Sequence, residues 1–206
     1  MKKIMFNDKY GLTQAVLDGR KTMTRRIIDY SKNKVFLDLL GDENYMKHEG
    51  TLSYDYKDDV LRIDDNFDCY ILRPYYNIGE VVAIAQAYND FFNDKYNPTL
   101  FPEGAGWDNK LFVKAELMPY RIRITNVKVE RLQNISDDEC IKEGVVTVID
   151  GDTQMPFYGV YDDTKDRGYP FDLSREAFAF LIDKVSSRGT WESNPWVFAY
   201  EFKLID

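Results

Sequence analysis

A long strand-like run at residues 121–132 is the feature that most constrains how this chain can fold. Ile122 and Ile124 fall on one face of an extended strand, whereas Val127 and Val129 have the opposite parity. Successive side chains of a strand point to opposite faces, so this change of parity predicts a β-bulge or a bend between the two pairs. We therefore expect one long, irregular strand at the centre of a sheet.

Two further segments have strand patterns. Residues 81–87 form an apolar run, which is typical of a buried strand. Residues 197–204 alternate between larger apolar side chains and a second set that includes charged ones, as in a strand with one face in solvent. Helical patterns lie elsewhere in the chain without a repeated strand–helix–strand order. This arrangement favours an α+β fold with a mostly antiparallel sheet.

Three helices are predicted from their start and stop signals. The first covers about residues 9–18 and ends at Gly19, which suits the position after a helix. The second begins with a capping box, Ser136 with Glu139, and ends before Gly144. The third is a longer amphipathic helix that we expect Ser174 to cap.

Other segments have weaker patterns. Residues 29–78 are acidic, and we interpret them as an insertion that contains a hairpin of 60–63 with 69–72. Residues 89–109 are predicted to be a long loop, because they are rich in proline, glycine and aromatic residues. Residues 145–170 are also expected to be loop-like.

Composition indicates one globular domain over residues 1–206, with 44% hydrophobic and 30% charged residues. The formal net charge of −8 opposes nonspecific binding to nucleic acid, so any such role needs a local basic patch. Two cysteines do not make a disulfide framework. The N-terminus lacks the apolar run of a signal peptide, and no stretch approaches the ~18 apolar residues of a membrane span. We therefore expect a cytoplasmic protein without membrane contact.

The basic segment Gly19-Arg20-Lys21-Thr22-Met23-Thr24-Arg25-Arg26 is the strongest candidate for a functional centre. A threonine hydroxyl becomes a nucleophile only when a base accepts its proton. A lysine can act as that base if its pKa falls toward neutrality, and neighbouring arginines favour this. The same segment could also be a solvated basic loop or a phosphate cradle without chemistry.

Four separated pieces of the chain resemble the ASCH domain family, and in particular its larger members from bacteria and phage-derived elements. They are the first helix with the segment 19–26, Ile78-Gly79-Glu80-Val81, the block from Met118-Pro119 to Glu143-Gly144, and Trp191-Glu192-Ser193-Asn194-Pro195-Trp196-Val197. The resemblance spans nearly the whole chain apart from residues 29–78.

This resemblance implies a small PUA-like β-barrel with flanking helices and an RNA-related function. Some small members of the family are amidohydrolases that remove an acyl group from the exocyclic amine of acetylated cytidine. Their reactive lysine, threonine and glutamate match Lys21, Thr24 and Glu143. The chain departs from those enzymes in its size, in its insertion and in having Arg25-Arg26 where they have an apolar residue and then an arginine.

RNA or a modified nucleoside is therefore the expected ligand. Arginine suits phosphate because its planar fork donates two parallel hydrogen bonds, and aromatic rings can stack on bases. The candidate binding residues are Arg20, Arg25, Arg26, Tyr120, Arg121 and Trp107. Packing in the core or at its rim is the alternative role for the two aromatic residues.

No cofactor is expected. His48 is the only histidine, which argues against a histidine-based triad or a zinc cluster, and the chain has no GxGxxG or Walker loop. Three functions stay open from the sequence: a deacylating amidohydrolase, a non-catalytic RNA-binding module, and an interaction or accessory protein of a phage or mobile element. In the last case the acidic insertion would be a docking surface or a nucleic-acid mimic.

Overall fold

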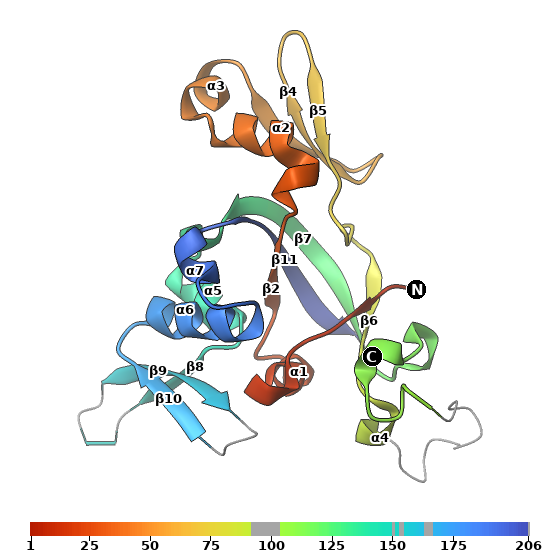
Figure 1. Cartoon of the computed structure of the whole chain (residues 1–206), viewed down its shortest axis with the longest axis vertical. Coiled ribbons are helices and arrows are strands. Elements are labelled where there is room, and N and C mark those ends of the chain that lie inside the picture. Colours follow the sequence, from red (N-terminus) through yellow and green to blue (C-terminus); the bar gives the residue numbers. More distant parts are fainter. Residues whose placement is uncertain (92–103, 150, 153–154, 163–166, 206) are drawn as a thin grey trace.

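The computed structural model describes residues 1–91, 104–149, 151–152, 155–162 and 167–205. Its main element is a five-stranded sheet with the order β1-β6-β7-β11-β2. The strands are β1 (Lys3–Ile4), β2 (Met23–Ile27), β6 (Val81–Ile84), β7 (Arg121–Arg131) and β11 (Trp196–Ile205). Only β1 and β6 pair in parallel, and the other three pairings are antiparallel. The predicted α+β class and mostly antiparallel sheet are confirmed (Figure 1).

The long strand β7 has the irregularity that its sequence predicts. Its pairing with β11 shifts register, so that Asn126 faces Glu201 but Ile124 faces Phe202, and Thr125 has no partner. The extra residue restores the side-chain phase: the apolar residues on either side of it are all buried in one core. The bulge thus lets one strand of 11 residues keep a continuous apolar face.

The pairing found among the described residues does not join the edge strands β1 and β2 into a closed barrel. The two edges nevertheless approach each other. The Arg26 guanidinium donates a hydrogen bond of 2.7 Å to the main-chain oxygen of Met5, directly after β1. The rings of Phe6 and Phe202 lie 5.7 Å apart between their centroids. The sheet is therefore curled, and side chains span the gap between its edges.

Short helices surround the sheet. They are η1 (Asp8–Tyr10), α1 (Leu12–Leu17), α4 (Tyr88–Phe91), η3 (Lys110–Phe112), η4 (Ala115–Leu117), η5 (Leu132–Asn134), α5 (Asp137–Lys142), α6 (Ser174–Val185) and α7 (Thr190–Ser193). The predicted capping box at the start of α5 is confirmed in both of its hydrogen bonds. The prediction that Ser174 caps α6 is wrong: Leu173 holds the cap position, and the Ser174 hydroxyl donates to Asp137 instead.

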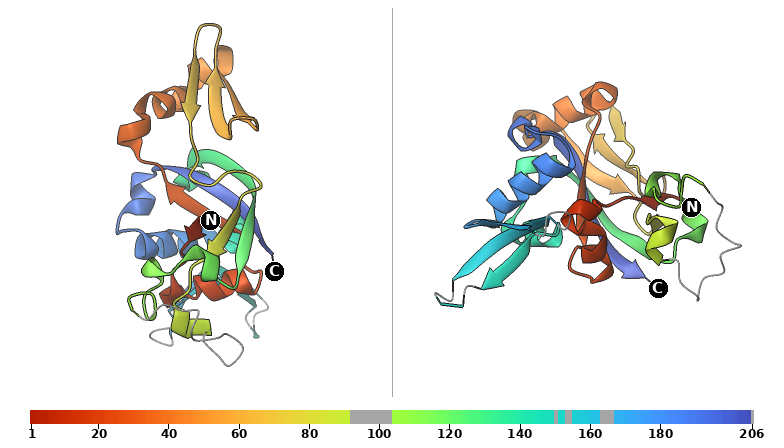
Figure 2. Two further views of the ribbon diagram at one scale, coloured as in Figure 1. Left: turned by 90° about the vertical axis from the view of Figure 1, so that its right-hand side faces the viewer. Right: turned by 60° about the horizontal axis from the view of Figure 1, so that its bottom comes forward.

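The segment that was predicted to be an insertion forms a unit whose sheet is separate from the main sheet. It contains α2 (Tyr30–Gly41), α3 (Glu43–His48) and a three-stranded sheet of β3 (Thr51–Asp55), β4 (Val60–Asp64) and β5 (Cys69–Leu72). The predicted hairpin is confirmed as the antiparallel pair β4 and β5. Figures 1 and 2 show this unit projecting at one end of the molecule. Its apolar side chains belong to the same buried cluster as those of the main sheet.

The prediction of a loop at residues 145–170 is wrong. This segment contributes β8 (Val146–Ile149) and β9 (Pro156–Asp162), which with β10 (Arg167–Phe171) form a third sheet beside α6 (Figure 1). Its glycines and prolines favour loops, but Phe180 of α6 packs on two rings of β10 and stabilises the sheet. Tertiary packing therefore overrides the local preference. The predicted loop at 89–109 falls mainly on residues 92–103, which lie outside the described residues.

No helix in the described part of the chain has the length and apolar character needed to cross a bilayer.

Gly144 occupies a position where the backbone conformation and the lack of space both favour glycine. Its φ is +107°, and a Cβ there would lie 2.8 Å from Cδ2 of Leu12. We expect Gly144→Ala to lower the free energy of unfolding by about 1–3 kcal/mol, measured by urea denaturation. Gly168→Ala is the control, because its Cβ would meet nothing closer than 3.8 Å at an ordinary φ. Equal unfolding midpoints for the two variants would contradict this account.

Candidate functional site

Lys21 reaches its position because the chain turns sharply after α1. Gly19 has a φ of +74°, and the Lys21 amide then donates back to the Ala15 oxygen. The next amide, of Thr22, donates to the oxygen of Lys142, so this segment lies against the end of α5. The Lys21 side chain, only 3% exposed, points its ammonium at the residue that follows this helix.

That residue is Glu143, and it binds Lys21 twice. The Lys21 Nζ donates to the main-chain oxygen of Glu143 at 2.7 Å and to its Oε2 at 2.8 Å. Glu143 is 4% exposed and is the C-cap of α5, where the capping box and Gly144 together determine the length and end of the helix. The second carboxylate oxygen, Oε1, accepts a hydrogen bond of 3.1 Å from Arg25. Glu143 is thus held between two cations.

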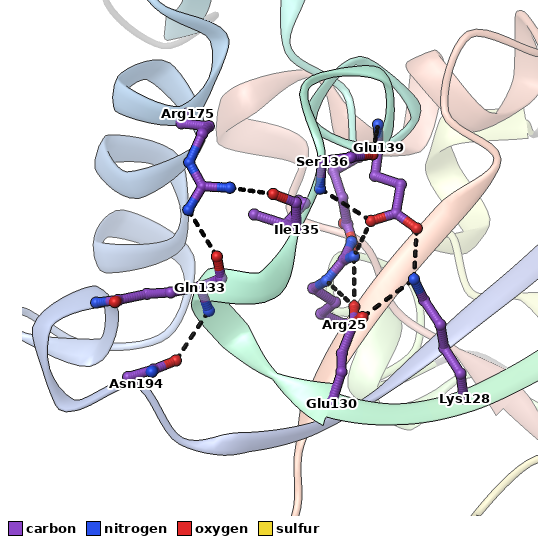
Figure 3. Close-up of polar contacts among 10 residues, drawn as sticks. Arg25, Lys128, Glu130, Gln133, Ile135, Ser136, Glu139, Arg175 and Asn194 are labelled. Carbon is purple, nitrogen blue, oxygen red and sulfur yellow. Dashed lines mark hydrogen bonds and ion pairs between the residues drawn. The ribbon is translucent and has the colours of Figure 1, made fainter.

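Arg25 is the centre of a wider charge network, much of which is drawn in Figure 3. Its Nε and one terminal nitrogen donate to Oε1 of Glu130, at 3.1 and 2.6 Å, and that nitrogen also donates to Glu139 at 2.7 Å. Lys128 bridges the other oxygens of the same two glutamates at 3.1 and 2.5 Å. The network, defined as Lys21, Arg25, Lys128, Glu130, Glu139 and Glu143, therefore contains three cations and three carboxylates.

Burial and attraction compete for the charges of this network. Burial lowers the pKa of the Lys21 ammonium, because the loss of hydration outweighs the attraction of Glu143. Burial acts in the same direction on Arg25, but the carboxylates of Glu143, Glu130 and Glu139 prevail and raise its pKa. The pKa of Glu139 is lowered: burial opposes this, but the hydrogen bond from Lys128 and the other favourable contacts outweigh it. Among the three cations of the network, Lys21 is thus the one whose charged form is stabilised least by its surroundings.

The network lies at one side of a cleft of about 690 Å³. Lys21, Thr24 and Arg26 line its polar side, and Phe178 and Ile182 of α6 line an apolar side. Thr24 is itself buried, with 5% of its surface exposed. The Thr24 residue therefore shares one cleft with the buried Lys21 amine.

The charges at the mouth of the cleft are paired. Lys110 is 2.5 Å from a carboxylate oxygen of Asp8, and Lys9 is 3.6 Å from one of Asp162. Arg26 donates to the Met5 oxygen and lies 6.0 Å from the centre of the Phe6 ring. Five cations (Lys9, Lys21, Arg25, Arg26 and Lys110) and two carboxylates (Asp8 and Glu143) line the cleft, so its lining has an excess of positive charge, and all of these cations except Arg26 have a carboxylate partner.

The structure brings together five of the nine residues that the sequence singled out. Lys21, Thr24, Arg25, Arg26 and Glu143 all line this cleft. Lys21 lies before β2 and Thr24 within it, and both residues line the cleft.

The other four candidate residues lie elsewhere. Arg20 pairs with Asp18 at 2.9 Å and lines a separate apolar hollow beside β8–β10. Tyr120 and Arg121 lie at the start of β7, whereas the network lies near its other end, roughly 30 Å along the strand. Trp107 packs against a small second core. The expectation that these residues converge with Lys21 is wrong: the length of β7 separates Tyr120 and Arg121 from the network, Arg20 lines another hollow, and Trp107 packs against another core.

Sequence reasoning missed Glu130, Glu139 and Lys128 as members of the site. Glu139 was assigned only a capping role, which it also performs: its Oε2 accepts from the Ser136 amide. Lys128 and Glu130 are two residues apart on β7 and so share a face, which was the available signal. Among the described residues, no group of three or more histidine, cysteine or acidic side chains is arranged to hold a metal ion.

Comparisons of the chain with protein-family models, with curated proteins and with solved structures found no match. The assignment of a function therefore depends on the motif residues and on their placement in the structure.

Removal of Arg25 tests the network directly. We expect Arg25→Met to lower the free energy of unfolding by about 3–5 kcal/mol, because three carboxylates lose their shared cation. The control is Arg20→Met, which removes an arginine of the same segment from a half-exposed surface pair and should leave the urea midpoint unchanged. A loss of stability no larger for Arg25→Met than for Arg20→Met would contradict the importance of the network.

Acid should weaken the same network. The pKa of Glu139 lies below its ordinary value of 4.5, so its ion pairs add stability above that value and lose it as the pH falls through the lowered pKa. We expect Glu139→Gln to flatten the fall of unfolding free energy at acid pH, measured by urea denaturation at a series of pH values. Glu176→Gln removes an exposed carboxylate of α6 and should keep the wild-type slope. Identical slopes for all three proteins would exclude this contribution of Glu139.

Proposed function

We propose that this chain is an amidohydrolase of the ASCH type that removes an acyl group from the exocyclic amine of an acylated cytidine. The observation that carries the proposal is the buried Lys21 amine, whose pKa is lowered by burial, in one cleft with the Thr24 hydroxyl. Such an amine is able to accept a proton at a pH where an exposed lysine, with a pKa of about 10.4, is almost fully charged.

The contacts of Lys21 favour this role for stereochemical reasons. A neutral lysine amine has two N–H donors and one lone pair. Its two donors are engaged by the main-chain oxygen and Oε2 of Glu143. The lone pair is then directed away from Glu143, where it can accept a proton. Glu143 in turn has both carboxylate oxygens occupied, so its role in the proposal is to orient Lys21.

The proposed reaction proceeds in two steps. In the first, the Thr24 oxygen adds to the carbonyl carbon of the acyl group while its proton passes to Lys21, and the carbon–nitrogen bond then breaks as Lys21 returns that proton to the leaving amine. In the second, Lys21 takes a proton from water, whose oxygen adds to the acyl ester on Thr24. The ester bond breaks, the proton returns to the Thr24 oxygen, and the products are a carboxylic acid and free cytidine.

The shape of the cleft and the burial of Arg25 support a small ligand more than an RNA backbone. A volume of about 690 Å³ is in the range of pockets for small molecules, and one wall is apolar. Arg25, which was expected to bind phosphate, has its side chain fully buried against carboxylates. The PUA-like barrel of the ASCH family is part of the proposal, and the contact of Arg26 with Met5 across the two sheet edges supports it.

The test is turnover of a panel of acylated cytidines by purified protein. We expect Thr24→Ala and Lys21→Ala each to abolish turnover, with a loss of at least about 10²-fold, while circular dichroism shows an intact fold. Thr22→Ala is the matched control, since Thr22 lies two residues away and does not line the cleft, and it should keep the wild-type rate. Wild-type protein that turns over no member of the panel, or Thr24→Ala with an undiminished rate, would reject the assignment. Salt-dependent RNA binding by the same inactive protein would then favour the RNA-binding module.

A further inference from the structure

Arg25 lines the cleft, but its hydrogen-bonding groups are directed into the protein. Its side chain is 0% exposed, and it makes four hydrogen bonds to carboxylates. Two of these go to Glu130, one to Glu139 and one to Glu143. A guanidinium has five N–H donors in a rigid plane, so little of its capacity remains for a ligand.

One of the two carboxylate oxygens of Glu143 is held by Arg25. Its Oε1 accepts from Arg25 and its Oε2 from Lys21, so the carboxylate is held from two sides. Arg25 is itself fixed by Glu130 of β7 and Glu139 of α5, which Lys128 links together. The position of the Lys21 amine is therefore determined by a chain of contacts that runs from β7 through Arg25 and Glu143.

We propose that Arg25 is a positioning residue for the Lys21–Glu143 pair and is not a ligand contact. The inference rests on the proposed function for its catalytic consequence, but the coupling between Arg25 and Lys21 can be measured without substrate. A rigid fork that binds three carboxylates keeps one oxygen of Glu143 away from Lys21, so the carboxylate is shared between the two cations.

The surrounding charges determine the direction of the effect. Glu143 attracts the Lys21 ammonium, whereas Arg25 and Arg26 on β2 repel it. Across the cleft, Asp8 is paired with Lys110, and Lys9 with Asp162. Behind Arg25, Lys128 pairs with both remaining glutamates. Loss of Arg25 removes a repulsion, and Glu143 then has Lys21 as its remaining cationic partner in the network. The Lys21 ammonium should therefore become more stable, and its pKa should rise.

The experiment uses the full chain with three variants. Arg25→Met combined with Glu130→Gln removes one positive and one negative charge, which keeps the network balanced and protects the fold. Arg25→Lys keeps the charge but loses the planar fork. Arg20→Met is the control, because Arg20 lies outside the cleft. NMR of isotope-labelled lysine follows the titration of Lys21, with Lys21→Met used to assign its signal.

We expect the pKa of Lys21 to rise in the double variant, to rise less in Arg25→Lys and to stay at the wild-type value in Arg20→Met. With an acylated cytidine as substrate, kcat should fall about ten- to hundred-fold in the double variant. KM should remain near the wild-type value, and the acid limb of kcat/KM should move to higher pH, because Lys21 acts in its neutral form.

An unchanged Lys21 titration in the folded double variant would overturn the inference, as would a rise in KM at constant kcat, which is the result expected of a ligand contact. If the double variant does not fold, an unchanged titration in Arg25→Lys has the same meaning. A shifted titration in a protein that turns over no acylated cytidine would reject the proposed function and retain the positioning role of Arg25.

Discussion

The pairing of Arg25 with Glu130, Glu139 and Glu143 is the interaction on which the rest of the site depends. It joins β2, β7 and α5, which are far apart in the sequence. A buried cation without partners costs several kcal/mol, so Arg25 can occupy this place only when all three carboxylates converge on it. Such a network adds little net stability compared with apolar packing, but it imposes a precise arrangement on the elements that carry it.

Lys21 owes its chemical character to that arrangement. An ammonium beside a carboxylate ordinarily gains stability, yet here burial prevails and the pKa of Lys21 falls. Because Arg25 takes one oxygen of Glu143, that carboxylate is shared, and its attraction for Lys21 is limited. The same contacts orient the amine toward the cleft that Thr24 lines. Stability, orientation and protonation of the site thus follow from one set of ion pairs.

Two local signals in the sequence were sufficient to predict the features that they control, whereas the predicted Ser174 cap of α6 was wrong. The parity change in β7 predicted its bulge, and the Ser136–Glu139 capping box predicted the start of α5. The β8–β10 sheet was missed, because its glycines and prolines favour loops and its stability comes from packing on α6. The separation of Tyr120 from the cleft was missed for a similar reason: the length of β7 determines it, and no local pattern reveals where the two ends of a strand lie relative to a distant loop.

The sequence by itself determined the α+β class and the central strands, which follow from local periodicity, whereas Lys21, Thr24 and Glu143 became a candidate set through the resemblance to the ASCH family. Only the tertiary structure decided what Arg25 does. From the sequence it belonged to a basic patch for phosphate, whereas in the folded chain it is buried against carboxylates from β7 and α5. The reason is physical: a charge is assigned its role by the partners within a few ångströms of it, and for Arg25 those partners lie more than a hundred residues away in the chain.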